Sequence, residues 1–522
     1  MINRKEFYMY KDEENNIKDK DIINLINYKN KIIIITSDIN EITFTSEGNE
    51  CNAGILVKNR NSDLIIKINN VYLNSVNQIA IDFRGGKNCD YKNKLVYSGI
   101  NTIMSEDNIG ICISNNQTVE ITGCENCRLN INGGSEMPAI GNNEWTAGGG
   151  HLIFSGYGNI EIIGGAGCKC YENLEHKGKC GSYAIGFCET NINDTSTIKI
   201  LENVNLKAIG GNGQSISSIA LNKCSGCGGA AISIGDNSSF EKIGLGVLEL
   251  IGGDSGESIG EYACGNCANG GDAIKIKSGL ININSPAILK GGKGGSISSK
   301  CKNVISKGGK GGDCISISES ELDEKLKKVK IKIDNCVQAK GGDGGNSGVY
   351  FNNENILGND GGDGGNFINS NDFKVEVAIG DIYFKGGKGG KGGEGQMRGH
   401  NGIIGNKFKG DNIYYTEFIK EENHKLGKYN EEIDDLVDEG SKHSDESVKE
   451  EQQKLCEVLE LVIDKQFEGN YLENHEDSGE EENKLVKLEN EILNVEYMEV
   501  SNKSNNIMIR IFQHIVNLIK KN

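Results

Sequence analysis

The strongest constraint on the fold of this chain is a set of glycine doublets that recurs through its middle. The doublets are "GGAG" at Gly164, "GGNG" at Gly210, "GGDSG" at Gly252, "GGKGG" at Gly291, "GGDGG" at Gly341 and "GGKGG" at Gly386. Successive doublets are 39 to 50 residues apart. Repeats of this length are typical of proteins built from stacked units, because a single unit is too small to bury its own core.

Short alternating segments lie between the doublets. In each of them, apolar residues alternate with Lys, Ser or Glu, as in residues 247–251, 273–277, 314–318, 329–333 and 375–379. This period of two predicts strands with one buried face. Glycine adopts positive φ without steric cost, so the doublets between the strands are interpreted as tight corners.

Together these features predict a mainly β fold, a right-handed parallel β-helix (β-solenoid) with coils of roughly 20 residues. A β-sandwich or meander is the alternative, but the Asn-Gly pairs that mark hairpins are few. We expect an N-terminal cap in residues 1–30 and the glycine-rich solenoid in residues 31–405.

The C-terminal region, residues 411–522, has a different composition. It carries a formal charge of −15 out of −18 for the whole chain, which leaves −3 for the first 410 residues. Apolar residues at helical spacing, such as Leu485, Leu488 and Ile492, predict an acidic α-helical region. It would cap the rod, or mediate self-association or docking to a surface protein. Neither region is basic overall, so no nucleic-acid partner is expected.

The sequence also gives cues about the compartment of the protein. The N-terminal segment is charged where a signal peptide has an apolar core, and "KIIIIT" at residues 31–36 is too short to span a membrane. We therefore expect no transmembrane segment and synthesis in the cytoplasm without a signal peptide. The 17 Cys favour an oxidising environment. A protein made in the cytoplasm and later exposed on a spore or cell surface would satisfy both cues.

The stretch "GGKGGDCIS" at residues 308–316 fits a nonapeptide calcium repeat, with Asp313 as the ligand and Ile315 as the buried residue. The related stretches do not follow nine residues later, however, and they carry Asn where Asp313 stands. We therefore favour a structural corner with Ile315 and Ile317 inward and Ser316 outward. On this interpretation, Asp313→Asn should change little. A phosphate loop is disfavoured because a strand, not a helix, follows.

The cysteines include three C-x-x-C pairs, of which the first is Cys124 and Cys127. The other two, Cys224/Cys227 and Cys264/Cys267, are 40 residues apart, so stacked coils could bring them together as a four-thiolate zinc site. Disulfide formation and inert burial are the alternatives. No other cofactor is expected, and zinc and calcium stay open as minor possibilities.

One aromatic segment, "GNNEWTAGG", offers a candidate glycan site. It holds the single Trp of the chain, Trp145, beside Asn142, Asn143 and Glu144. An aromatic ring next to polar groups suits a sugar, although a Trp that caps the core would look the same. A polysaccharide lyase or hydrolase would need two carboxylates facing one groove, and no such pair or catalytic motif is evident.

Several quoted segments also resemble a known family. "AGILVKNRNSDLIIKINNVYLNS", "IAIDFRGG", "QTVEITGCENCRLNINGGSEMPAIG" and "HLIFSGYGNIEIIGGAG" are similar to the glycine-rich, carbohydrate-binding β-helix surface proteins of Firmicutes. The similarity spans residues 41–395. It implies a β-helix, a cell-surface location and a polysaccharide ligand.

The resulting functional hypothesis is a non-enzymatic structural scaffold or adhesion protein of a bacterial cell or spore surface. The first alternative is a carbohydrate (polysaccharide)-binding module. The second is a polysaccharide-degrading β-helix enzyme.

Overall fold

The computed structural model describes residues 18–417 with gaps at residues 37, 59–60, 85–90, 115, 144–147, 168–177, 188–193, 218–224, 260–266, 298–299, 303–305, 319–327, 334–336, 353–354, 372, 381 and 411. The predicted helices of residues 411–522 therefore lie outside the described residues, apart from the start of that range. There the structure has a strand, β38 (Ile413–Glu417), instead of helix.

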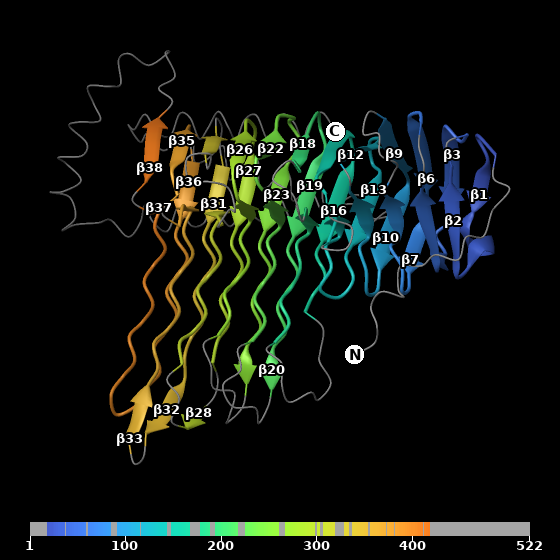
Figure 1. Cartoon of the computed structure of the whole chain (residues 1–522). Helices are drawn as coiled ribbons and strands as arrows, with labels where there is room; N and C mark the ends of the chain where they lie inside the picture. The colour runs from blue at the N-terminus through green and yellow to red at the C-terminus, as the bar shows by residue number, and fades with distance from the viewer. Residues whose placement is uncertain are drawn as a thin grey trace, which may run out of the picture. The chain divides into compact units, whose positions relative to one another are not determined.

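The described residues form three long parallel sheets (Figure 1). Sheet A has 12 strands in the order β1 (Ile22–Asn24), β3 (Glu41–Thr45), β6 (Leu64–Asn69), β9 (Lys92–Ser98), β12 (Gln117–Gly123), β15 (Gly150–Gly156), β18 (Thr197–Ile200), β22 (Ser238–Lys242), β26 (Gly279–Ile283), β30 (Val329–Ile333), β35 (Val375–Ile379) and β38.

Sheet B has 11 strands, in the order β2 (Lys31–Ile35), β5 (Ala53–Val57), β8 (Ile81–Phe83), β11 (Ile111–Ile113), β14 (Ile140–Gly141), β17 (Ile185–Gly186), β21 (Ile232–Ile234), β25 (Ile274–Ile276), β29 (Ile315–Ile317), β34 (Ile368–Asn369) and β37 (Phe408–Lys409).

Sheet C has 10 strands, in the order β4 (Glu50–Cys51), β7 (Tyr72–Ser75), β10 (Ile100–Ser105), β13 (Arg128–Asn132), β16 (Asn159–Ile163), β19 (Asn205–Ile209), β23 (Leu248–Ile251), β27 (Ala287–Lys290), β31 (Val337–Lys340) and β36 (Ile382–Lys385).

Each coil after the first visits sheet A, then sheet C, then sheet B, and the next coil pairs with it in parallel. The predicted mainly β, parallel solenoid is therefore confirmed. A short 3-10 helix, η2 (Leu25–Tyr28), packs against β2 and β4 in the first coil.

The core is a stack of aligned apolar side chains. In sheet B, Ile232 pairs with Ile274, Ile274 with Ile315 and Ile315 with Ile368, and all four are buried. Ile317 is also buried, as predicted. Burying each of these side chains contributes roughly 1.5–3 kcal/mol. Because the strands of sheet B place apolar side chains at the same inward positions, the coils stack in register.

One charged side chain interrupts this apolar core. Lys242, at the end of β22, is fully buried. Its Nζ donates a hydrogen bond to the carbonyl of Gly244. Burial away from water lowers the pKa of this ammonium to about 8.

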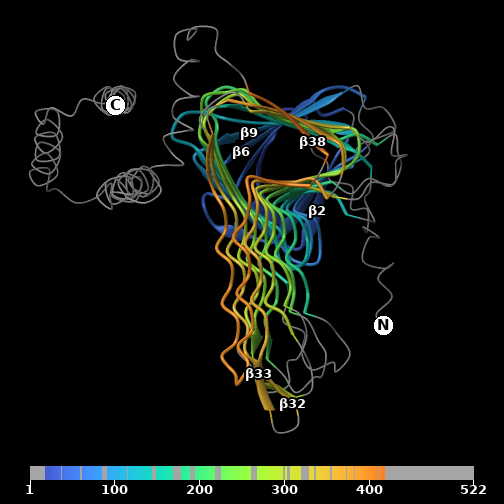
Figure 2. The same cartoon turned by 90° about the vertical axis from the view of Figure 1, so that its left-hand side faces the viewer.

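The connection from sheet C to sheet B changes along the chain. In the early coils it is short, as between β4 and β5. From Gly164 onward it lengthens into an extended projection, which we call the glycine fin (Figures 1 and 2). Each coil contributes an outgoing leg, which starts after its sheet C strand, and a return leg, which ends at its sheet B strand. The outgoing legs begin at Gly164, Gly210, Gly252, Gly291, Gly341 and Gly386.

Figure 2 shows the legs running side by side away from the three-sided solenoid. Two small sheets lie within the fin. One pairs β20 (Ile216–Ser217) with β24 (Ser258–Ile259), and the other joins β28 (Lys300–Lys302), β32 (Val349–Asn352) and β33 (Asn355–Gly358). The chain thus combines a solenoid with a second kind of lattice built from glycine.

Candidate functional site

The fin is held together by a three-residue repeat in which the N–H group of each position has its own kind of partner. In the third described outgoing leg, the Gly252 N–H donates to the Lys290 carbonyl, which directly precedes the next outgoing leg (2.8 Å), and the Gly253 N–H donates to the Gly229 carbonyl of a return leg (2.8 Å). We call these the first and second positions of the repeat. The period of three is that of a polyproline II helix, which has no internal hydrogen bonds and must bond to neighbours.

Gly252 and Gly253 have no room for a side chain, because neighbouring chains fill that space. A Cβ on Gly252 would lie 1.9 Å from the Gly271 carbonyl oxygen, and one on Gly253 would lie 2.1 Å from that of Gly211. None of the doublet glycines has positive φ. The interpretation of the doublets as tight corners was therefore wrong: they are straight legs in which glycine allows close packing.

The third position of the repeat points outward and carries the side chains. Its own N–H is satisfied by a side-chain oxygen of the preceding coil, so that Asp, Asn and Ser form ladders. On the return legs, the Asp313 N–H donates to Asp272 Oδ1 (2.7 Å), the Asn366 N–H to Asp313 Oδ1 (2.6 Å) and the Asn406 N–H to Asn366 Oδ1 (2.9 Å). The short polar residues after each doublet are thus structural acceptors.

Asp313 is the most heavily bonded member of this ladder. Its Oδ2 accepts from Lys310 Nζ (2.6 Å) and Asn369 Nδ2 (2.8 Å), while the Asn366 side chain also reaches its Oδ1 (2.8 Å). The Lys310 ammonium thus lies against the carboxylate that the calcium interpretation named as the ligand. Within the described residues, no group of three or more His, Cys, Asp or Glu side chains has metal-binding geometry.

The neighbouring Asp272 shares this environment at the root of the fin. Its Oδ2 accepts a hydrogen bond from Ser316 Oγ (2.5 Å). Burial, reinforced by the charge of Asp313, raises the pKa of the Asp272 carboxyl to about 6. Ser316 alternates with the inward Ile315 and Ile317, as expected, but the root of the fin covers it, so it is buried. The two carboxylates serve to join the fin to sheet B.

A disulfide replaces one rung of the ladder at the start of the fin. Cys180 and Cys227 occupy the third position in consecutive return legs and form a disulfide, and the Cys227 N–H points at Cys180 Sγ (3.2 Å). Of the predicted zinc ligands, Cys227 is thus oxidised, and Cys267 is buried beside Ser258. Cys224 and Cys264 lie outside the described residues, so the zinc site stays a prediction that requires this disulfide to open.

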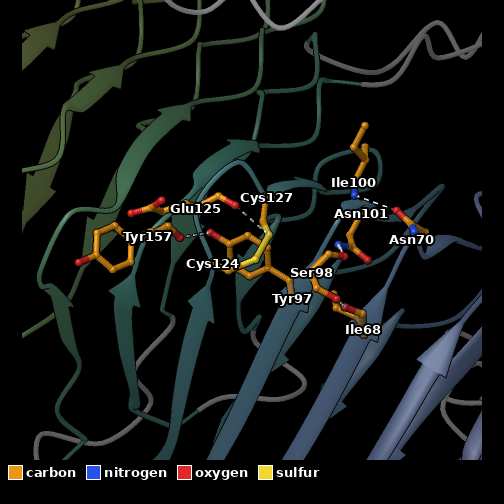
Figure 3. Close-up of a disulfide and its surroundings, with 10 residues drawn as sticks. All are labelled: Ile68, Asn70, Tyr97, Ser98, Ile100, Asn101, Cys124, Glu125, Cys127 and Tyr157. Carbon is orange, nitrogen blue, oxygen red and sulfur yellow. Dashed lines mark hydrogen bonds between the residues drawn. A yellow bond between two sulfur atoms is a disulfide. The ribbon is translucent and has the colours of Figure 1, made fainter. Parts of the chain in front are cut away.

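The first C-x-x-C pair forms a second disulfide, between Cys124 and Cys127, in the turn before β13 (Figure 3). The fully buried Tyr97 lies next to it and donates its hydroxyl to the Tyr157 carbonyl (3.0 Å). Burial raises the pKa of Tyr97. The disulfide and the tyrosine together close a corner of the solenoid, which indicates a structural role for this pair.

Half of the predicted glycan patch falls on described residues. Asn142 is buried, and its side-chain amide donates to the Gly148 carbonyl. The Asn143 amide lies 3.8 Å from Met137 Sδ. Glu144 and Trp145 lie outside the described residues, so the patch stays a prediction.

The last coil of the fin departs from the glycine rule. In the preceding return leg, a Cβ on Gly361 or Gly364 would lie 2.1 or 1.9 Å from a carbonyl of the following outgoing leg. The equivalent residues of the last return leg are Asn401 and Ile404. Asn401 Oδ1 accepts the Gly392 N–H (3.0 Å), and Ile404 Cγ2 lies 3.3 Å from the Cβ position of Gly386. These two side chains fill the space in which another leg would lie.

The outgoing legs and sheet C together carry a group of lysines, which we call the lysine face. Its members share one outward surface and comprise Lys290, Lys293, Lys340, Lys385, Lys388 and Lys391. All but Lys290 are exposed. Sequence reasoning missed this surface, although "FKGGKGGKGG" at residues 384–393 places a lysine at every third residue. Once the period of three is known, this segment predicts one lysine-bearing face.

Comparisons with known proteins add no assignment. No family model, no curated protein and no solved structure matches this chain. In the part of the chain that the structure describes, no helix is long and apolar enough to span a bilayer.

Proposed function

We propose that this protein is a non-enzymatic scaffold or adhesion protein that displays a rigid, regular surface on a bacterial cell or spore. The glycine fin is the observation that carries this proposal. Two of every three residues in its legs are used for backbone packing, and the third points outward. Such a lattice presents side chains in fixed rows, which suits attachment more than catalysis.

The chemistry of the carboxylates supports this proposal over the enzymatic alternative. Hydrolysis of a glycoside needs two carboxyl groups directed at a substrate. Asp272 and Asp313 are close neighbours, but their oxygens accept hydrogen bonds from the protein itself. A right-handed coil, a helical C-terminal docking region and a surface location complete the proposal, and they rest on the sequence.

The test uses the full-length purified protein on intact bacterial cells and spores and on a panel of neutral and acidic polysaccharides. Cosedimentation measures attachment, and reducing ends or unsaturated uronide products measure cleavage. We expect attachment without product. If wild-type protein released products and Asp272→Ala and Asp313→Ala did not, the enzymatic alternative would replace the scaffold. Retention on one neutral glycan that Trp145→Ala abolished would instead favour the glycan-binding module at residues 142–145.

A further inference from the structure

Charged side chains on the outer faces of the sheets usually alternate in sign between neighbouring strands. Lys67 pairs with Glu41 (2.6 Å), Lys94 with Glu120 (3.0 Å) and Lys199 with Glu241 (3.2 Å). Opposite charges at facing positions stabilise a sheet, and like charges destabilise it. The lysine face departs from this alternation of positive and negative side chains.

Three lysines occupy directly facing positions at the end of sheet C. Lys290 on β27 is in register with Lys340 on β31, which is in register with Lys385 on β36. Adjacent strands are about 4.8 Å apart, so these ammonium groups repel one another. Lys290 has an acidic partner, Glu249 (3.2 Å), but Lys340 and Lys385 make no ion pair in the part of the chain that the structure describes.

The row of lysines runs across the strands of sheet C as far as Lys385 and then continues along the last outgoing leg. Lys385, Lys388 and Lys391 all occupy the third position of the repeat, so they share the outward face. A period of three at 3.1 Å per residue spaces them by about 9 Å. Neither Lys388 nor Lys391 makes an ion pair within the described residues. Asp343, in the preceding leg, accepts the Lys388 backbone N–H (2.9 Å), and the exposed Glu394 ends the lysine row three residues after Lys391.

The return legs, which form the other layer of the fin, have no such excess of unpaired charge. Lys307 pairs with Asp363 (3.3 Å), Lys310 with Asp313, and His400 lies beside Asp360 (3.1 Å). The unpaired lysines thus gather on one layer of a protein whose net charge is −18. Their repulsion costs stability unless an anion lies across them.

An aromatic side chain stands next to the lysine row. Tyr383 on β36 is 63% exposed, and its neighbour in register on β31 is Gln338, which is also exposed. An exposed ring beside an amide is a surface on which a sugar ring stacks and forms hydrogen bonds. This combination distinguishes the lysine face from a purely electrostatic patch.

We propose that the lysine face binds a linear acidic polysaccharide, with its anionic groups over Lys340, Lys385, Lys388 and Lys391 and a sugar ring on Tyr383. The spacing of about 9 Å along Lys385, Lys388 and Lys391 favours a polymer with an anionic group on alternate sugars. A nucleic-acid strand carries one charge per about 3.4 Å, which is far denser than this row. The site does not depend on the scaffold role, since polymer binding and attachment to cells are measured separately.

The experiment measures binding of the full-length protein to hyaluronate, which carries a carboxylate on alternate sugars, by isothermal titration calorimetry at low and moderate salt. Neutral dextran, poly-glutamate and duplex DNA are the comparison polymers. We expect hyaluronate to bind more tightly than all three, and its affinity to fall as salt rises. Equal or tighter binding of DNA or poly-glutamate would overturn the proposal in favour of another class of polyanion.

Matched variants assign the binding to this surface. Lys385→Gln/Lys388→Gln/Lys391→Gln should weaken hyaluronate binding at least tenfold and make its salt dependence shallower. Lys67→Gln/Lys199→Gln/Lys330→Gln removes the same charge from sheet A and should leave binding unchanged. Tyr383→Ala should weaken binding without changing the salt dependence. Equal losses in both triple variants, or no loss in the first, would refute the assignment, provided that melting temperatures show all variants folded.

Discussion

Asp313 Oδ1 accepts hydrogen bonds from both the backbone N–H (2.6 Å) and the side-chain amide (2.8 Å) of Asn366, which occupies the same place one coil later. The two residues are therefore consecutive rungs of one ladder, yet they are not interchangeable. Asp313 also receives two donors on its second oxygen, which an amide could not accept.

Asp313→Asn should consequently destabilise the protein, contrary to the expectation from sequence. The new amide N–H₂ would face Lys310 Nζ and Asn369 Nδ2, both donors, so we expect a loss of about 1–3 kcal/mol. Urea denaturation measures it. Asp254→Asn is the control, because Asp254 accepts only the Lys293 N–H through Oδ1 (2.8 Å), a bond that Asn retains. Equal stability of the two variants would contradict the ladder.

Asp272→Asn should stabilise the protein at pH 7. Burial raises the folded-state pKa of Asp272 to about 6, so the folded state binds its proton more tightly than the unfolded state does. The contribution of this residue to stability is therefore greatest below pH 4 and falls as pH rises through 6. An Asn side chain keeps the bond from the Asp313 N–H through its Oδ1, can donate through its Nδ2 to Ser316 Oγ, and removes this pH dependence.

The difference in free energy of unfolding between wild type and Asp272→Asn, followed from pH 4 to pH 7, isolates this effect. Glu120→Gln serves as the control of opposite sign, because burial, which raises the pKa of Glu120, is outweighed by the hydrogen bonds from Ser155 and Lys94 together with the charges of Lys94 and Lys92, so that its pKa is lowered. There the stabilising contribution is lost as pH falls. A pH-independent difference for Asp272→Asn would disprove the raised pKa.

Lys242→Met should also stabilise the protein, here by removing a charge from the core. Burial lowers the pKa of Lys242 to about 8, so its ammonium costs stability at pH 7 and this cost disappears as pH rises from 8 to 10. We expect a gain of about 1–2 kcal/mol at pH 7. Thermal melts of wild type and variant at pH 7 and pH 10 should converge; a constant gap would show that Lys242 does not titrate.

Gly292→Ala should be costly although alanine is the smallest substitution. Its Cβ would lie 2.0 Å from the Gly253 carbonyl oxygen. We expect a loss of about 1–3 kcal/mol, or local separation of the legs that hydrogen exchange detects. Lys293→Ala, at the adjacent outward position, should change stability by less than about 0.5 kcal/mol. Similar effects at both positions would rule out the three-residue repeat.

Asn401→Gly/Ile404→Gly should open the end of the fin. With both side chains gone, Gly386 and Gly389 would offer backbone N–H groups that lack partners among the described residues, and another glycine-rich leg could pack there. Analytical ultracentrifugation should show association of this variant, or binding of a peptide with the sequence of residues 386–395. Ile403→Gly, which removes an exposed outward side chain from the same leg, should leave the protein as it was.

The sequence predicted the solenoid because period-two alternation reports directly on one buried face. It could not predict the fin, since a doublet in a corner and a doublet in a packed leg have the same composition. Only the positions of neighbouring chains distinguish Gly252 as a place without room for a Cβ from a glycine with positive φ. The predicted coil of roughly 20 residues fits the first coil, where Ile22 pairs with Thr43, and fails from Gly164 onward, because the legs lengthen each later coil.

The candidate sites also differ in whether a local sequence pattern could predict them. The pairing of Cys227 with Cys180 instead of Cys224 or Cys264 depends on which residues share the third position in adjacent legs. The lysine row of Lys290, Lys340 and Lys385 depends on strand register, which no local pattern encodes. By contrast, the inward placement of Ile315 followed from alternation alone.

The three-residue repeat imposes a reading frame on the legs of the fin. An insertion of one or two residues would rotate every later side chain of that leg into space that carbonyl groups occupy. An insertion of three residues preserves the phase, and so does duplication of a whole coil. Among descendants of this gene, the lengths of these legs should therefore differ by multiples of three residues, while the solenoid strands keep their lengths.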